Sequence, residues 1–269
     1  MRRFALTAVA LAAIAVAGCS SSTTSSPASG STSSPAAAAG SSSAAQTGTI
    51  TVFAASSLKD TFTQLGKQFE TAHPGDTVKF SFGASSALAE QINSGAPADV
   101  FASASPKNMG QVVTPGNASN PQNFAKNVME VAVPPSNPAK VTSVDNLAKS
   151  SVKTGLCQPQ VPCGVVAAEV FKNAKITVKP VTLQPDVKSV LTQVELGNVD
   201  AGVVYVTDVM AAGSKVKGVT IPADENASTL YPIAALTHSK YPSVAQAFVA
   251  YVLSPAGEQV LKAAGFEQP

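Results

Sequence analysis

This 269-residue sequence has little net charge and few cysteine or histidine side chains that could bind a metal. It has 18 Lys and Arg against 16 Asp and Glu, and two of the basic residues, Arg2 and Arg3, lie in an N-terminal segment that we expect to be removed. The mature chain then has a formal net charge of zero, which excludes attraction to nucleic acid or anionic lipid as its mode of binding. There are three cysteines and two histidines, and the positions of His73 and His238 do not give convincing spacing for a metal site.

The N-terminus has the features of an export signal. A short basic start precedes an apolar run from Phe4 to Val16, which is short for a membrane-spanning helix. The run closes with Ala17-Gly18-Cys19, which is similar to a bacterial lipobox. This pattern predicts a signal peptide over residues 1–18, lipid attachment at Cys19, and a location at the cell membrane on its extracytoplasmic face. The alternative is an ordinary signal peptide in which Cys19 is incidental.

Residues 19–47 are almost wholly Ser, Ala, Thr, Gly and Pro, without a charged or large apolar side chain. Such a segment cannot bury enough apolar surface to fold, so we expect a disordered tether. The chain that follows, residues 48–269, is long enough for one large domain or for two lobes with cores of their own.

The stretch from Thr49 to Asp60 predicts a strand that ends at small residues and continues as a helix. Ser57 and Asp60 have the spacing of a capping box. A helix start presents unpaired N–H groups and the positive end of the helix dipole, so this turn predicts an anion site. The same succession recurs at Ser85, after a second β-rich run over residues 77–82.

Strands and helices alternate along the rest of the chain, which predicts an α/β fold. We expect two lobes, each a mostly parallel sheet flanked by helices, with a ligand cleft between them. The expected bounds are residues 48–126 with 225–269 for the first lobe and 127–224 for the second. The chain would cross between the lobes near Asn127 and near Asp224.

Four helix starts are expected at this cleft, namely Ser56-Ser57, Ser85-Ser86, Pro162-Cys163-Gly164 and Pro185-Asp186-Val187. Tyr205, at the end of a predicted strand, adds a phenol that stays protonated at neutral pH. Lys188 is the basic residue near these turns, and its spacing places it inside a helix. The pattern favours a small anion held by dipoles and hydrogen bonds rather than by ion pairs.

Six segments carry a specific resemblance: Ile50–Leu58, Ser81–Ala89, Gly95–Ala104, Val161–Gly164, Pro185–Val187 and Gly202–Tyr205. In this order, and over about residues 49–266, they resemble the periplasmic molybdate-binding proteins of molybdate ABC transporters, the ModA family. The resemblance implies a type II periplasmic binding-protein fold. It also implies a monomer without cofactor or catalytic activity that captures molybdate, with tungstate as a second ligand, and delivers it to a membrane permease.

The resemblance also implies the ligand-binding groups. The metal would be present only inside the oxyanion, with no direct protein ligand. The oxyanion would be bound by the hydroxyls of Ser57, Ser85 and Tyr205 and by the backbone amides of Ser57, Ser85, Cys163 and Val187. Many relatives have Ala where this chain has Cys163, but a backbone donor tolerates that change if the turn keeps its shape. A carboxylate facing a dianion would repel it, so we expect Asp186 to cap its helix and point away.

Cysteine counting predicts a disulfide. If Cys19 carries lipid, Cys157 and Cys163 remain as an even pair in an oxidising compartment. A bond between them would stiffen the turn that presents the Cys163 amide, whereas the alternative is two free thiols.

Three other functions remain open at this point. A receptor for sulfate or phosphate would use similar donors, although monohydrogen phosphate carries a proton that needs an acceptor. A ferric-iron receptor would require clustered tyrosines or carboxylates, and the four tyrosines are dispersed along the sequence. A serine hydrolase would use Ser57 or Ser85 with His73 or His238 as base, but neither serine lies in a G-x-S-x-G turn.

Overall fold

The computed structural model describes residues 47–269. The expected signal peptide, the Cys19 lipidation site and all of the expected tether except Thr47 lie outside the described residues. Within this range, every helix is too short or too polar to cross a bilayer.

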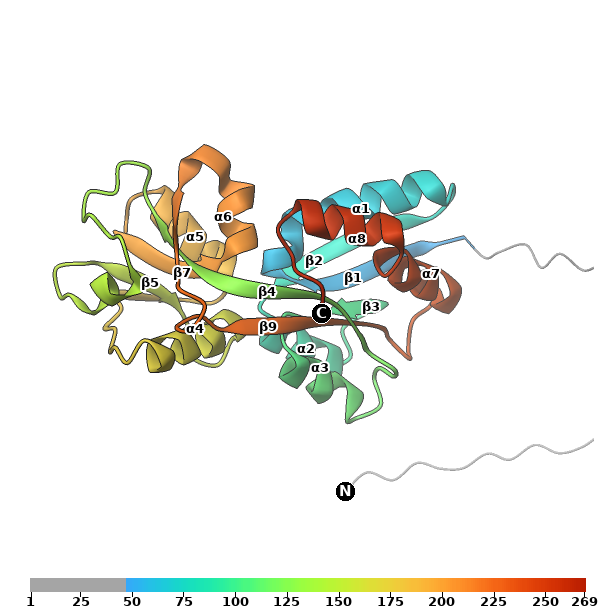
Figure 1. Ribbon diagram of the computed structural model, residues 1–269. Helices are drawn as coiled ribbons and strands as arrows, with labels where there is room; N and C mark the ends of the chain where they lie inside the picture. Colours follow the sequence, from blue (N-terminus) through green and yellow to red (C-terminus); the bar gives the residue numbers. More distant parts are fainter. Residues whose placement is uncertain (1–46) are drawn as a thin grey trace, which may run out of the picture. The chain divides into compact units, whose positions relative to one another are not determined.

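The first lobe holds both ends of the described chain (Figure 1). It contains β1 (Thr49–Ala55), the 3-10 turn η1 (Ser56–Leu58), α1 (Lys59–Ala72), β2 (Thr77–Gly83), α2 (Ser85–Asn93), β3 (Val100–Ala102), α3 (Pro106–Val113), β9 (Ser228–Ala235), α7 (Pro242–Val252) and α8 (Pro255–Ala263). Strands β2, β1 and β3 are parallel, and β9 joins β3 in the antiparallel direction. The predicted return of the chain to the first lobe at β9 is therefore confirmed.

The second lobe repeats this arrangement with shorter strands. It contains the 3-10 turn η2 (Val144–Ala148), β5 (Thr154–Cys157), α4 (Pro162–Asn173), β6 (Thr182–Gln184), α5 (Val187–Glu195), β7 (Ala201–Tyr205), α6 (Val206–Ala212), the 3-10 turn η3 (Gly213–Lys215) and β8 (Lys217–Thr220). Strands β6, β5 and β7 are parallel. The carboxyl ends of the parallel strands in both lobes lead into the helix starts that were predicted to bind an anion.

One long strand, β4 (Gln122–Val133), belongs to both lobes. Its first part pairs with β9 as far as Val128, and from Met129 it pairs with β7 on one side and β8 on the other, always antiparallel. The sheet is therefore continuous from lobe to lobe, and β4 and β9 lie side by side where the lobes meet (Figure 1).

Each lobe has its own apolar core. In the first lobe, Leu58 of η1 and Phe62, Leu65 and Phe69 of α1 are fully buried. In the second lobe, β7 is buried along its whole length between α4 and α5. Burial on both faces explains why β7 is a continuous apolar run rather than an alternating one.

Two local predictions need correction. Ser57 and Asp60 do not form a capping box, since α1 is preceded by the turn η1 and has no side-chain cap. Both side chains are instead bonded to distant partners, Ser57 to Tyr231 and Asp60 to Lys188. Helix α6 was not predicted from the sequence.

Candidate functional site

The four predicted helix starts converge on one cavity between the lobes. It is lined by Ala55, Ser56, Ser57, Gly83, Ala84, Ser85, Ala104, Val161, Pro162, Cys163, Asp186, Val187 and Tyr205. All five predicted ligand-binding residues are in this lining. Residues that lie far apart in the sequence are thus brought together at one cavity.

Ser57 and Ser85 come from the first lobe, and both are buried. Ser57 lies in η1 directly after β1, and its Oγ is 2.9 Å from the Tyr231 hydroxyl. Ser85 begins α2, and its Oγ accepts a hydrogen bond of 2.9 Å from the Ala104 N–H. The Ser85 proton is not donated to any acceptor within residues 47–269, so this hydroxyl can donate to a ligand.

Cys163 and Val187 come from the second lobe, where each lies in the first turn of a helix. The first N–H groups of a helix have no partner inside it. Within the described residues, neither the Cys163 N–H nor the Val187 N–H donates to a backbone carbonyl outside its helix. The second lobe therefore supplies two backbone donors and the positive ends of two helix dipoles.

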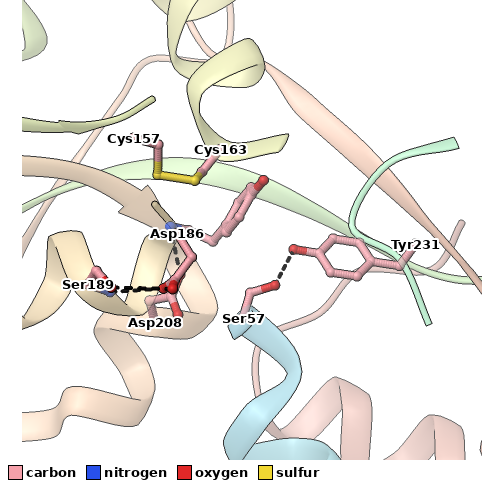
Figure 2. The surroundings of a disulfide bond; sticks show 8 residues. Ser57, Cys157, Cys163, Asp186, Ser189, Asp208 and Tyr231 are labelled. Carbon is pink, nitrogen blue, oxygen red and sulfur yellow. Dashed lines mark hydrogen bonds between the residues drawn. A yellow bond between two sulfur atoms is a disulfide. The ribbon is translucent and has the colours of Figure 1, made fainter. Parts of the chain in front are cut away.

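The predicted disulfide between Cys157 and Cys163 is present, with the two Cα atoms 5.8 Å apart. It ties the end of β5 to the start of α4, as Figure 2 shows. Gly164 follows the bridge, and a Cβ at that position would overlap the Gln158 carbonyl. The turn that presents the Cys163 amide is thus fixed by a covalent bond on one side and by close backbone packing on the other.

Asp186 caps α5 as predicted. Its carboxylate accepts from the Ser189 N–H at 3.0 Å and lies 3.3 Å from the Ser189 hydroxyl (Figure 2). Asp186 also belongs to the cavity lining, but these two bonds hold its carboxylate toward the helix. Its negative charge is therefore directed at donors of its own helix.

Tyr205 ends β7 and is buried. Its hydroxyl has no hydrogen-bond partner within residues 47–269, although it lies beside the cavity. Burial, together with the neighbouring Tyr231 and Asp208, raises the pKa of Tyr205 well above its ordinary value. The side chain is thus an uncharged phenol with a proton to donate, and a buried phenol without a partner is costly unless a ligand accepts that proton.

Two parts of the site were missed by the sequence analysis. The first is Tyr231, which lies in β9. Its ring centroid is 6.2 Å from that of Tyr205, so two of the tyrosines described as dispersed are neighbours in space. Burial raises the pKa of both phenols, which disfavours the tyrosinate form that ferric iron would need.

The second is a partly buried ion-pair cluster formed by Lys188, Asp60 and Asp208. Lys188 Nζ lies 2.7 Å from Asp60 of the first lobe and 3.3 Å from Asp208 of its own lobe. Burial alone would lower the pKa of Lys188, but Asp208 and Asp60 together outweigh it and raise that pKa. Burial raises the pKa of Asp208 to about 6, against the opposing effects of Lys188 and the Tyr205 N–H. At pH 7 the cluster is thus a charged contact between the lobes.

The catalytic and metal alternatives find no support in this arrangement. Neither histidine lines the cavity, and His73 stacks on Phe69 with ring centroids 4.1 Å apart. No group of three or more His, Cys, Asp or Glu side chains suited to a metal ion occurs in residues 47–269. The donors that do meet at the cavity are hydroxyls and amides.

Two lobes joined by a shared strand, with a small cavity of neutral donors between them, define a binding protein for a small anion. The family model described as "Bacterial extracellular solute-binding protein" matches residues 50–267. The chain belongs to this family of bacterial extracellular solute-binding proteins.

Its relatives extend over the whole sequence. The chain is 39% identical over 100% of both sequences to the molybdate-binding protein ModA of Mycobacterium tuberculosis. It is 31% identical to a Bacillus subtilis protein described as a putative ABC transporter substrate-binding lipoprotein, with 98% of each sequence covered. Among solved structures, the periplasmic molybdate-binding protein of Azotobacter vinelandii has a TM-score of 0.74 over 82% of this chain and 99% of that chain. At 22% identity, that structure shows the shared fold alone.

Proposed function

We propose that this protein captures molybdate, and tungstate as a second ligand, and delivers it to the permease of an ABC transporter. The relatives support the ligand class, since the Mycobacterium tuberculosis protein at 39% identity is a molybdate-binding protein. The cavity supports it independently, because its donors come from both lobes and surround one small space.

The observation that carries the proposal is the Tyr205 hydroxyl, which is buried beside the cavity and has no hydrogen-bond partner among residues 47–269. An oxyanion oxygen would accept its proton. The same ligand would accept from the hydroxyls of Ser57 and Ser85 and from the amides of Ser57, Ser85, Cys163 and Val187. The molybdenum or tungsten atom would then contact the protein only through its oxygens.

The donor set also favours one protonation state of the ligand. Asp186 is the carboxylate in the lining, and it already accepts a hydrogen bond from the Ser189 N–H. A fully ionised dianion needs only donors, whereas monohydrogen phosphate would place its proton against them. The site therefore suits molybdate, tungstate or sulfate better than phosphate.

The two lobes would close over the ligand as separate bodies. We propose residues 48–126 with 225–269 as one body and 127–224 as the other. The change of β4 partners between Val128 and Met129 supports this division. At the second crossing, the Asn226 side chain bonds both the N–H and the carbonyl of Met129, at 3.1 and 2.9 Å, so the two crossings are tied together.

The proposal places a monomer at the outer face of the cell membrane, attached by lipid at Cys19 and by the tether of residues 19–47. The description of the Bacillus subtilis relative as a lipoprotein supports the anchor. Lipid at Cys19 would be tested by the mass of the protein purified from membranes, with Cys19→Ser as the control.

Calorimetric titration of the mature protein tests the ligand. We expect tight binding of molybdate and tungstate, weaker binding of sulfate, and none of phosphate. Tight binding of sulfate without heat from molybdate or tungstate would contradict the assignment and leave a receptor for another oxyanion.

A further inference from the structure

Tyr231 lies directly behind Ser57. Its hydroxyl is 2.9 Å from Ser57 Oγ, and its side chain is fully buried. Figure 2 shows the two hydroxyls facing each other, with Ser57 on its turn and Tyr231 on the strand opposite. Tyr231 is not part of the cavity lining, so its hydroxyl would reach a ligand only through Ser57.

The direction of this hydrogen bond follows from counting protons. If Ser57 donated, the Tyr231 proton would need another acceptor. The other polar groups beside it are the Tyr205 hydroxyl, which makes no hydrogen bond within residues 47–269, and Asn127, whose side-chain oxygen already accepts from the Val128 N–H. A buried O–H without an acceptor is unfavourable. If Tyr231 donates, its proton is satisfied and the Ser57 proton is free for the cavity. Burial also raises the pKa of Tyr231, so the proton stays on the phenol.

The Ser85 hydroxyl also accepts a hydrogen bond from the first lobe, and here the donor is a backbone N–H, so the direction of the bond is fixed. Its Oγ accepts from the Ala104 N–H at 2.9 Å, and an N–H can only donate. Ser57 and Ser85 thus each have a first-lobe group positioned to donate to the hydroxyl oxygen. A hydroxyl that accepts one hydrogen bond becomes a stronger donor in the next.

We propose that Tyr231 is a positioning residue for oxyanion binding, which donates to Ser57 Oγ and so directs the Ser57 proton into the cavity. This inference rests on the proposed function, since it needs an anion in the cavity to accept that proton. It assigns to Tyr231 an effect on affinity without contact with the ligand.

A double-mutant cycle on molybdate affinity tests this role. The four proteins are the wild type, Tyr231→Phe, Ser57→Ala and the double variant, each titrated with molybdate. We expect Tyr231→Phe to weaken binding by about three- to tenfold, the effect of one net hydrogen bond. In the Ser57→Ala background the same change should alter affinity by less than about twofold, because the group through which Tyr231 acts is gone.

Tyr251→Phe is the matched control, since it removes a phenol hydroxyl that bonds Gln68 at 3.4 Å rather than a cavity residue. Its affinity should equal that of the wild type. The thermal midpoint of each ligand-free variant separates a folding defect from a binding effect, because a purely structural role would move the midpoint without coupling to Ser57.

Two results would overturn the inference while leaving the proposed function in place. One is an unchanged affinity of Tyr231→Phe, and the other is an equal loss in the wild-type and Ser57→Ala backgrounds. A wild-type protein that binds neither molybdate nor tungstate would overturn the proposed function and this inference together, and that result is visible before any variant is made.

Discussion

Lys188 is paired with two carboxylates that differ sharply in burial. We therefore expect the loss of Lys188 and the loss of Asp60 to lower the unfolding free energy by different amounts. Asp208 is fully buried, whereas the Asp60 side chain is 59% exposed. Lys188→Met leaves a buried carboxylate without its cation, and breaking a buried pair in this way costs roughly 3 kcal/mol or more of unfolding free energy. Asp60→Asn removes an exposed partner, for which about 0.5 kcal/mol is typical.

Urea denaturation of the ligand-free protein at pH 7 measures both costs. Lys126→Met is the matched control, because it breaks the exposed pair that Lys126 makes with Glu267 at 2.7 Å, and it should resemble Asp60→Asn. At pH 5 the cost of Lys188→Met should shrink, since Asp208, with a pKa of about 6, is then largely protonated in the wild type as well. If Lys188→Met lowers the unfolding free energy at pH 7 no more than Asp60→Asn does, the burial of Asp208 does not determine how much these ion pairs stabilise the protein.

Three further results are expected. Tyr205→Phe and Ser85→Ala should each weaken molybdate binding by roughly 10- to 150-fold in calorimetry, since each removes a hydrogen bond to a charged ligand; unchanged affinity in both would remove them from the site. The pKa of Asp208 is raised on folding, so its contribution to stability is fully present below about pH 4 and is lost as the pH rises through about 6. The urea stability of the wild type relative to Asp208→Asn should therefore fall between these pH values, and a constant difference would contradict this shift. Reduction of the Cys157–Cys163 disulfide should lower the unfolding free energy by about 2 kcal/mol and weaken molybdate binding, and an unchanged affinity would show that the bridge does not position the Cys163 amide.

The local parts of the site could be predicted from the sequence. Small residues after β-rich runs predicted the turns at Ser57 and Ser85. The even pair of Cys157 and Cys163, in a compartment that permits disulfides, predicted their bond. Each of these features depends on a few neighbouring residues and on backbone groups whose direction the secondary structure fixes.

The contacts between distant segments could not be predicted in this way. Ser57 and Tyr231 are 174 positions apart, and nothing near Tyr231 indicates which hydroxyl it meets. Asp60 and Lys188 are 128 positions apart, and each resembles an ordinary charge on a helix surface. The side-chain partner of Ser57 depends on the return of β9 beside β4, which is a property of the whole fold.

Anomalous diffraction from crystals grown with molybdate would locate the molybdenum atom itself. We expect a single peak in the cavity between the lobes, with the oxyanion oxygens within hydrogen-bond distance of the Ser57, Ser85 and Tyr205 hydroxyls and the Cys163 and Val187 amides. No protein atom should bond the metal. A peak outside this cavity, or a side chain bound directly to molybdenum, would contradict the assignment of an oxyanion held by neutral donors from both lobes.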